Sequence, residues 1–107
     1  MLASAALFAM AVDLSSIQSA VLADAQQRSR VETQQPRILR SDAVIWPDGS
    51  LGCPEPGRMY TQALVKGYRI RVGAGSAVFE YHANRSGQWL YCPPERVSEP
   101  LPDDATK

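Results

Sequence analysis

The hydrophobic and polar residues of this chain change their spacing near residue 37. Between residues 13 and 30, apolar residues recur every three or four positions, which is the spacing of one face of an α-helix. That face contains Leu14, Ile17, Val21 and Ala25, and Leu22 widens it. After residue 37 the period becomes two, which is typical of β-strands. The pattern therefore predicts an N-terminal helix over residues 13–30 and a sheet after it.

Four segments are predicted as strands, at residues 38–46, 60–72, 76–83 and 88–92. Gly73-Ala74-Gly75 and Asn84-Arg85-Ser86-Gly87 are turn sequences between the last three of them. Short connections of this kind favour antiparallel pairing. The predicted fold class is α+β: one N-terminal helix packed on a four-stranded antiparallel meander, formed as a single domain by residues 12–92.

The two ends of the chain differ in composition from this domain. Residues 2–10 are an apolar run followed by a small-x-small pattern, so we interpret residues 1–11 as a signal-peptide remnant or as an apolar N-terminal extension. The run is too short to span a membrane. Residues 93–107 are rich in proline and acidic residues, and we expect them to be disordered.

The charge of the chain argues against a nucleic-acid partner. The 107 residues carry 11 basic and 11 acidic side chains, with a net charge of zero. Residues 1–92 hold nine basic against seven acidic residues, and the last fifteen carry the compensating acidic excess. Nucleic-acid binding needs a concentrated basic face, which this mild asymmetry does not provide.

The two cysteines are predicted to form a disulfide. Cys53 and Cys92 are 39 positions apart, and a bridge closing a loop of that size stabilises a small domain by roughly 4 kcal/mol. The alternative is two buried free thiols. Because disulfides persist outside the reducing cytosol, the bridge and the apolar leader together predict an exported protein. No Cys/His cluster indicates a metal.

The stretch WPDGSLGCPEPG, residues 46–57, is predicted to form a rigid loop. WPDG and EPGR are both turn sequences, with proline placed to fix φ and glycine placed for a conformation that other residues resist. A disulfide at Cys53 would anchor the loop between the two turns. The loop either only staples the fold, or also binds a partner, or takes part in catalysis. The candidate partner-binding residues are Asp48, Ser50, Leu51, Glu55, Arg58, Tyr60 and Gln62.

A second candidate surface is the sheet face opposite the helix. Alternation places four polar side chains there: Arg69, Arg71, Glu80 and His82. His82, the single histidine, and Glu80 are suited to general base catalysis, but a solvent-facing pair has the same pattern. Ser50, Asp48 and His82 have the residue types of a triad, without the turn that presents a nucleophile. No glycine-rich phosphate loop or cofactor motif is present.

The sequence from residue 44 to residue 92 resembles a family of small exported bacterial proteins without an assigned activity. The shared pattern is W-x-D-x-S-L-G-C-P-x-P-G-x-x-Y-T-Q at residues 46–62, then G-Y-R-I at residues 67–70 and E-Y-H at residues 80–82. The resemblance implies an exported or lipoprotein-borne domain, periplasmic or secreted in a bacterium, and transfers no catalytic residues.

A weaker likeness is to cystatin-type protease inhibitors, which have a similar layout of a helix followed by antiparallel strands. Residues 62–67 are similar to the Q-x-V-x-G motif of that family but are one residue longer, and Trp89 has a parallel in a later hairpin. This likeness implies inhibition of a cysteine protease through Gln62 and its neighbours.

The sequence thus favours a small exported, non-catalytic binding domain with a protein or cell-envelope partner. We expect it to be a monomer or weak dimer with no cofactor and no metal. The alternatives are a cystatin-like inhibitor and, third, a small hydrolase that uses His82.

Overall fold

The computed structural model describes residues 13–29 and 35–102, which form one helix and a four-stranded antiparallel sheet. In chain order these are α1 (Leu14–Ser29), β1 (Arg37–Trp46), β2 (Val65–Ala74), β3 (Ala77–Asn84) and β4 (Trp89–Tyr91), followed by a 3₁₀ turn, η1 (Pro94–Arg96). The strands lie in the order β1-β2-β3-β4, so the predicted α+β meander is confirmed. Residues 1–11, where the leader was predicted, lie outside the described residues.

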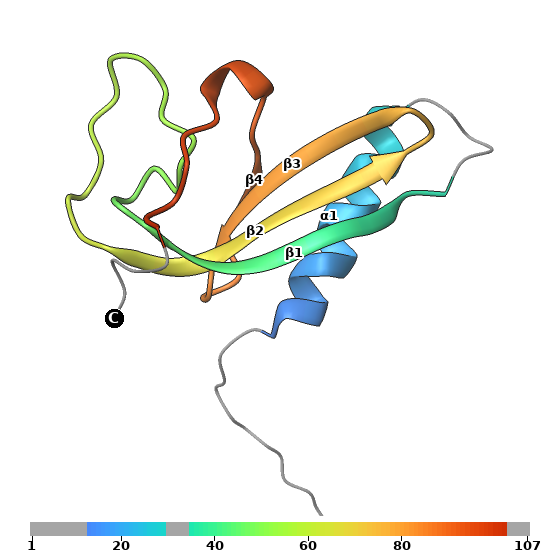
Figure 1. The fold of residues 1–107 in the computed structure, drawn as a ribbon, viewed down its shortest axis with the longest axis horizontal. Helices are drawn as coiled ribbons and strands as arrows, with labels where there is room; N and C mark the ends of the chain where they lie inside the picture. The colour runs from blue at the N-terminus through green and yellow to red at the C-terminus, as the bar shows by residue number, and fades with distance from the viewer. Residues whose placement is uncertain (1–12, 30–34, 103–107) are drawn as a thin grey trace, which may run out of the picture.

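The helix packs on one face of the sheet, as Figure 1 shows. Ile17, Val21 and Ala25 are its buried residues, and they meet Ile70 of β2 and Tyr81 of β3 in the core. The helix also forms a polar contact with the sheet, because the Tyr81 hydroxyl donates a hydrogen bond to Asp24 at 2.6 Å. No helix in the described part of the chain is both long enough and apolar enough to cross a membrane.

Two strands are shorter than the sequence predicts. β2 begins at Val65 instead of Tyr60, because Tyr60 and Thr61 bond to the preceding loop: the Tyr60 hydroxyl accepts from the Glu55 N–H at 3.0 Å, and the Thr61 carbonyl accepts from the Gly49 N–H at 2.9 Å. β4 is reduced to Trp89–Tyr91, because the Gln88 N–H donates to the Asn84 side chain in the preceding turn. We call residues 47–64, between β1 and β2, the stapled loop.

Residues 93–102 are ordered, where the sequence predicted disorder from residue 93. The Ser98 N–H donates to the Gly52 carbonyl at 2.8 Å, and the Leu101 N–H donates to the Ile45 carbonyl at 2.9 Å. These main-chain bonds tie the segment to the stapled loop and to the edge of β1, and its prolines reduce the entropy lost on ordering. Residues 103–107 lie outside the described part.

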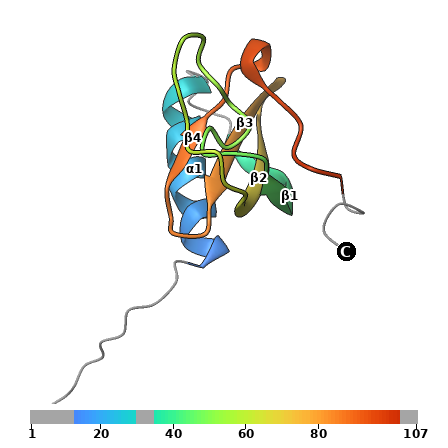
Figure 2. The same ribbon diagram turned by 90° about the vertical axis from the view of Figure 1, so that its left-hand side faces the viewer.

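The stapled loop and residues 93–102 lie side by side at one end of the sheet, away from the helix (Figures 1 and 2). They cover part of the sheet face that a single helix leaves open. The candidate site therefore lies in this third layer and in the sheet face beneath it.

Candidate functional site

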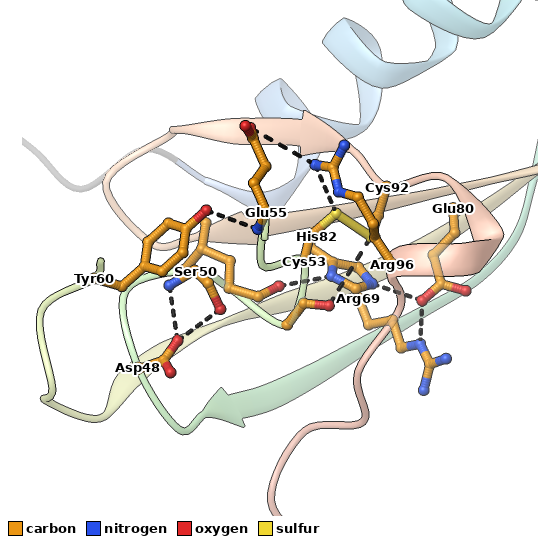
Figure 3. Close-up of a disulfide and its surroundings, with 12 residues drawn as sticks. Asp48, Ser50, Cys53, Glu55, Tyr60, Arg69, Glu80, His82, Cys92 and Arg96 are labelled. Carbon is orange, nitrogen blue, oxygen red and sulfur yellow. Dashed lines mark hydrogen bonds and ion pairs between the residues drawn. A yellow bond between two sulfur atoms is a disulfide. The ribbon is translucent and has the colours of Figure 1, made fainter. Parts of the chain in front are cut away.

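A disulfide joins the stapled loop to the end of the last strand. Cys53 and Cys92 are bonded, with their Cα atoms 5.8 Å apart, so the predicted bridge is confirmed (Figure 3). Both cysteines are buried. Because neither is a free thiol, nucleophilic cysteine chemistry is excluded in the oxidised protein.

Hydrogen-bonded turns shape the loop on both sides of Cys53. Before it, the Asp48 carboxylate accepts from the backbone N–H and the hydroxyl of Ser50, at 2.9 and 2.6 Å. After it, the Arg58 N–H donates to the Glu55 carbonyl and Gly57 has a φ of 80°, the conformation expected of the EPGR turn. The loop is thus held at several points before any partner arrives.

The first turn differs from the prediction in its register. The positive φ angles fall at Leu51 and Gly52, at 56° and 70°, and not at Gly49. A side chain at Gly52 would come within 2.3 Å of the Trp46 ring and 2.8 Å of the Ser98 carbonyl oxygen. Glycine is therefore required at residue 52 both by its φ and by the close approach of the chain on two sides.

His82 is buried under this loop, which corrects the expectation of a solvent-facing side chain. It is 0% exposed, and its ring stacks on Trp46 with centroids 4.4 Å apart. The Trp46 indole in turn donates to the Ala83 carbonyl at 3.1 Å, across Gly67 of β2. A side chain at Gly67 would meet that carbonyl oxygen at 1.9 Å, so glycine permits the indole to lie across the sheet.

Both ring nitrogens of His82 are hydrogen-bonded to acceptors. Nδ1 lies 2.6 Å from the Leu51 carbonyl oxygen. Nε2 lies 2.6 Å from the Glu80 carboxylate (Figure 3). Both ring nitrogens are thus engaged by protein acceptors, and the ring has no solvent contact. Neither nitrogen is left to take a proton from a bound molecule, which argues against the use of His82 as a general base.

The carboxylate of Glu80 is the centre of an ion-pair network on this face. It pairs with Arg69 at 2.7 Å and Arg71 at 3.3 Å, and Arg69 also pairs with Glu99 at 2.7 Å. Burial alone would raise the pKa of Glu80, but the hydrogen bonds from His82 and Arg69 outweigh it and the pKa is lowered. The expected solvated face is corrected here for Arg69 and Glu80, which are 12% and 14% exposed; Arg71 remains exposed at 41%.

We expect acid to destabilise the protein through this network. The pKa of Glu80 is lowered, and the hydrogen bond from Arg69 lowers the pKa of Glu99, so both groups stabilise the fold above the unfolded-state value of about 4.3. That stabilisation is lost as the pH falls through the lowered folded-state pKa values. Urea unfolding measured at decreasing pH should show the loss below about pH 4. Glu80→Gln should reduce this loss of stability in acid, whereas Glu95→Gln, at an exposed position, should leave it unchanged. An equal loss of stability in both variants would contradict the assignment.

A hollow of about 480 Å³ lies between the stapled loop and β4. Five of the seven predicted partner-binding residues line it: Ser50, Leu51, Glu55, Arg58 and Tyr60. The other two do not line the hollow. Asp48 accepts a hydrogen bond from the Ser50 hydroxyl, and Gln62 is exposed and donates to the Tyr60 carbonyl. The structure therefore brings most of the predicted set together around one concave surface.

The rest of the lining of the hollow is not predicted by the sequence. β4 contributes Trp89, Leu90 and Tyr91, and η1 contributes Arg96. Arg96 donates to the Cys53 sulfur at 3.4 Å and lies 3.9 Å from the Glu55 carboxylate. Its position depends on the fold of the 93–102 segment, which has no hydrophobic period in the sequence.

The other predicted chemistries receive less support from this geometry. The Ser50 hydroxyl bonds to Asp48, and both His82 nitrogens are bonded elsewhere, so no Ser-His hydrogen bond forms. Residues 62–64 lie in the loop and residues 65–67 in β2, so the segment compared with the cystatin motif is not a hairpin tip; inhibition stays a prediction. Among the described residues, no group of His, Cys, Asp and Glu side chains is arranged to hold a metal.

Comparison with known proteins places the chain in a family without assigning a function. Neither the curated proteins nor the solved structures include a match to this chain. Residues 18–92, which run from within α1 to Cys92, match the model of a domain of unknown function, DUF8738. This match agrees with the resemblance to a family without an assigned activity. It establishes neither the motif at residues 46–62 nor the likeness to cystatins. The chain belongs to the DUF8738 family.

Proposed function

We propose that this protein is a non-catalytic binding domain that works outside the reducing cytosol and holds a protein or cell-envelope partner in the hollow beside the stapled loop. The observation that carries the proposal is the fixation of the loop. The Cys53–Cys92 bridge, the Gly49–Thr61 hydrogen bond and the Gly52–Ser98 hydrogen bond hold it at three separate points. A loop ordered in advance loses little conformational entropy when a partner binds.

The residues around the hollow support binding over chemistry. Tyr60, Trp89 and Tyr91 supply aromatic area, and Arg58 and Arg96 supply charge. Tryptophan, tyrosine and arginine are the residue types that contribute most to the affinity of protein interfaces. The one imidazole of the chain is buried and bonded at both nitrogens, so it is not available to the hollow as a general base.

The compartment is part of the same proposal. A disulfide that closes a 39-residue separation in a small domain is typical of proteins in oxidising surroundings. Cell fractionation followed by alkylation of the native protein tests this directly. We expect the protein in the periplasmic or secreted fraction with both thiols unreactive until a reductant is added; a cytosolic protein with two reactive thiols would contradict it.

Binding through the hollow is tested by paired substitutions at its wall. Arg58→Ala and Tyr60→Ala each remove an exposed or half-exposed contact group, and each should weaken retention of the partner from a native envelope extract by about tenfold or more. Arg40→Ala removes an arginine of similar exposure from β1 and serves as the matched control. Unchanged retention by both hollow variants, with their melting temperatures preserved, would show that the hollow is not the binding site.

A further inference from the structure

The outer edge of β4 carries unpaired backbone groups. The Asn84 N–H donates to the Gln88 carbonyl, and the Cys92 N–H donates to the Glu80 carbonyl, which places Gln88 and Cys92 in the hydrogen-bonded positions of the ladder with β3. Leu90, between them, is opposite His82 and is the third such position. The N–H and C=O groups of Trp89 and Tyr91 therefore point away from β3, and they form no hydrogen bond within the described residues.

The residues that carry these free groups line the hollow. Trp89 to Tyr91 form one wall of it, and the stapled loop with Arg96 forms the other. All three β4 residues are half-exposed. A segment entering the hollow would thus meet two backbone donors and two backbone acceptors along one edge, in the spacing that an extended strand matches.

The opposite edge of the sheet carries more devices against pairing than this edge does. β1 has a register shift between Ile38 and Arg40, exposed charges at Arg40 and Asp42, and a carbonyl at Ile45 already bonded to Leu101. Bulges, charges and covering segments are the devices that block strand addition at sheet edges. The β4 sequence Trp-Leu-Tyr has no charge and no bulge. Its length of three residues and the prolines after Cys92 limit pairing to a short segment.

The charges on the wall opposite β4 favour an extended segment that carries an acidic side chain. Arg58 and Arg96 share one carboxylate, Glu55, at 3.3 and 3.9 Å. The Arg96 Nε is buried and has no hydrogen-bond partner among the described residues. Two guanidinium groups with one counter-charge leave a positive surplus, which an acidic side chain of the incoming segment would neutralise.

Building on the proposed function, we propose that the partner is a protein that adds an extended, acidic segment as a fifth strand along the outer edge of β4. Its backbone pairs with Trp89 and Tyr91, and an Asp or Glu side chain reaches Arg58 and Arg96. Tyr60, on the loop wall, covers the apolar side of the added strand.

The test uses short random peptides displayed on phage and selected on the oxidised protein. We expect the enriched peptides to be β-prone with a central Asp or Glu, and their synthetic forms to bind about tenfold more weakly when alternate backbone nitrogens on one edge are methylated. Methylation on the opposite edge is the control, since those nitrogens face solvent. On the protein, Tyr91→Pro removes an outward N–H and should weaken binding relative to Tyr91→Ala, which loses the same ring but keeps that N–H.

Each other result separates the two proposals. Peptides that depend on Arg58 and Tyr60 but tolerate methylation on either edge would overturn strand addition and leave the hollow as the binding site. If selection on the wild-type protein enriches no peptide beyond those enriched on Tyr91→Pro, strand addition is likewise overturned. A dimer that forms with rising concentration and is lost in Tyr91→Pro, but kept in Tyr91→Ala, would assign the edge to a second copy of the chain instead.

Discussion

Replacing both cysteines with alanine is expected to lower the free energy of unfolding by about 4 kcal/mol. The bridge joins residues separated by 39 positions, so removing it returns a large loop-closure entropy to the unfolded chain. The stapled loop also loses its central anchor at Cys53. Urea unfolding of the oxidised protein and of the Cys53→Ala/Cys92→Ala variant measures the difference.

The same measurement in a reductant provides the control. The wild-type protein should then approach the double variant in stability, and the variant itself should not change. A double variant within about 1 kcal/mol of the oxidised protein would show that the loop and the 93–102 segment are held by their hydrogen bonds alone.

Substituting His82 with alanine is expected to cost about 3 kcal/mol or more, because it leaves a cavity and removes a hydrogen-bond partner from buried groups. The variant loses the Trp46 stacking contact and both ring hydrogen bonds, and it leaves the Leu51 carbonyl without its donor. A solvent-facing histidine would cost within about 0.5 kcal/mol. Urea unfolding thus distinguishes a buried His82 from the solvent-facing His82 that strand alternation alone suggests.

A double-mutant cycle assigns part of this effect to Glu80. His82→Ala and Glu80→Ala should cost less together than the sum of the single variants, because each removes the same 2.6 Å contact. His82→Ala with Asp24→Ala is the matched control, since Asp24 bonds to Tyr81 on the helix side of the sheet. Additive behaviour of the His82/Glu80 pair would contradict the network.

Much of the fold is predictable from the sequence because it depends on local periodicity and turn chemistry. The three-four spacing of Ile17, Val21 and Ala25 identifies the buried side of the helix. The Gly75-containing turn and the Asn84 turn fix antiparallel hairpins, and the proline and glycine of EPGR produce the predicted turn with Gly57 at positive φ.

Other parts of the site could not be predicted, because period-two alternation says which face a residue lies on and not what covers that face. It places His82 opposite the helix correctly, yet the cover comes from the stapled loop and from residues 93–102. The contacts that hold this cover, Ser98 to Gly52 and Leu101 to Ile45, are main-chain hydrogen bonds between distant segments. They leave no trace in hydrophobic pattern, and the proline-rich composition favoured disorder.

The sequence does carry one signal that this face is covered. Gly67 lies inside a strand, where glycine usually marks a close approach of other atoms. In the structure the Trp46 indole crosses the sheet at that point to reach the Ala83 carbonyl. A glycine in β2 combined with a tryptophan at the end of β1 indicates that the sheet face opposite the helix is covered there.

The central claim is that the stapled loop is ordered before a partner binds. Amide hydrogen exchange of the oxidised protein, followed residue by residue by NMR, tests it most directly. We predict slow exchange at Gly49, Cys53 and Ser98, whose N–H groups donate within this layer, and fast exchange at the exposed Met59 in the same loop. If Gly49, Cys53 and Ser98 exchange as fast as Met59 while Ile70 in the core stays protected, the loop is not preformed and the account is wrong.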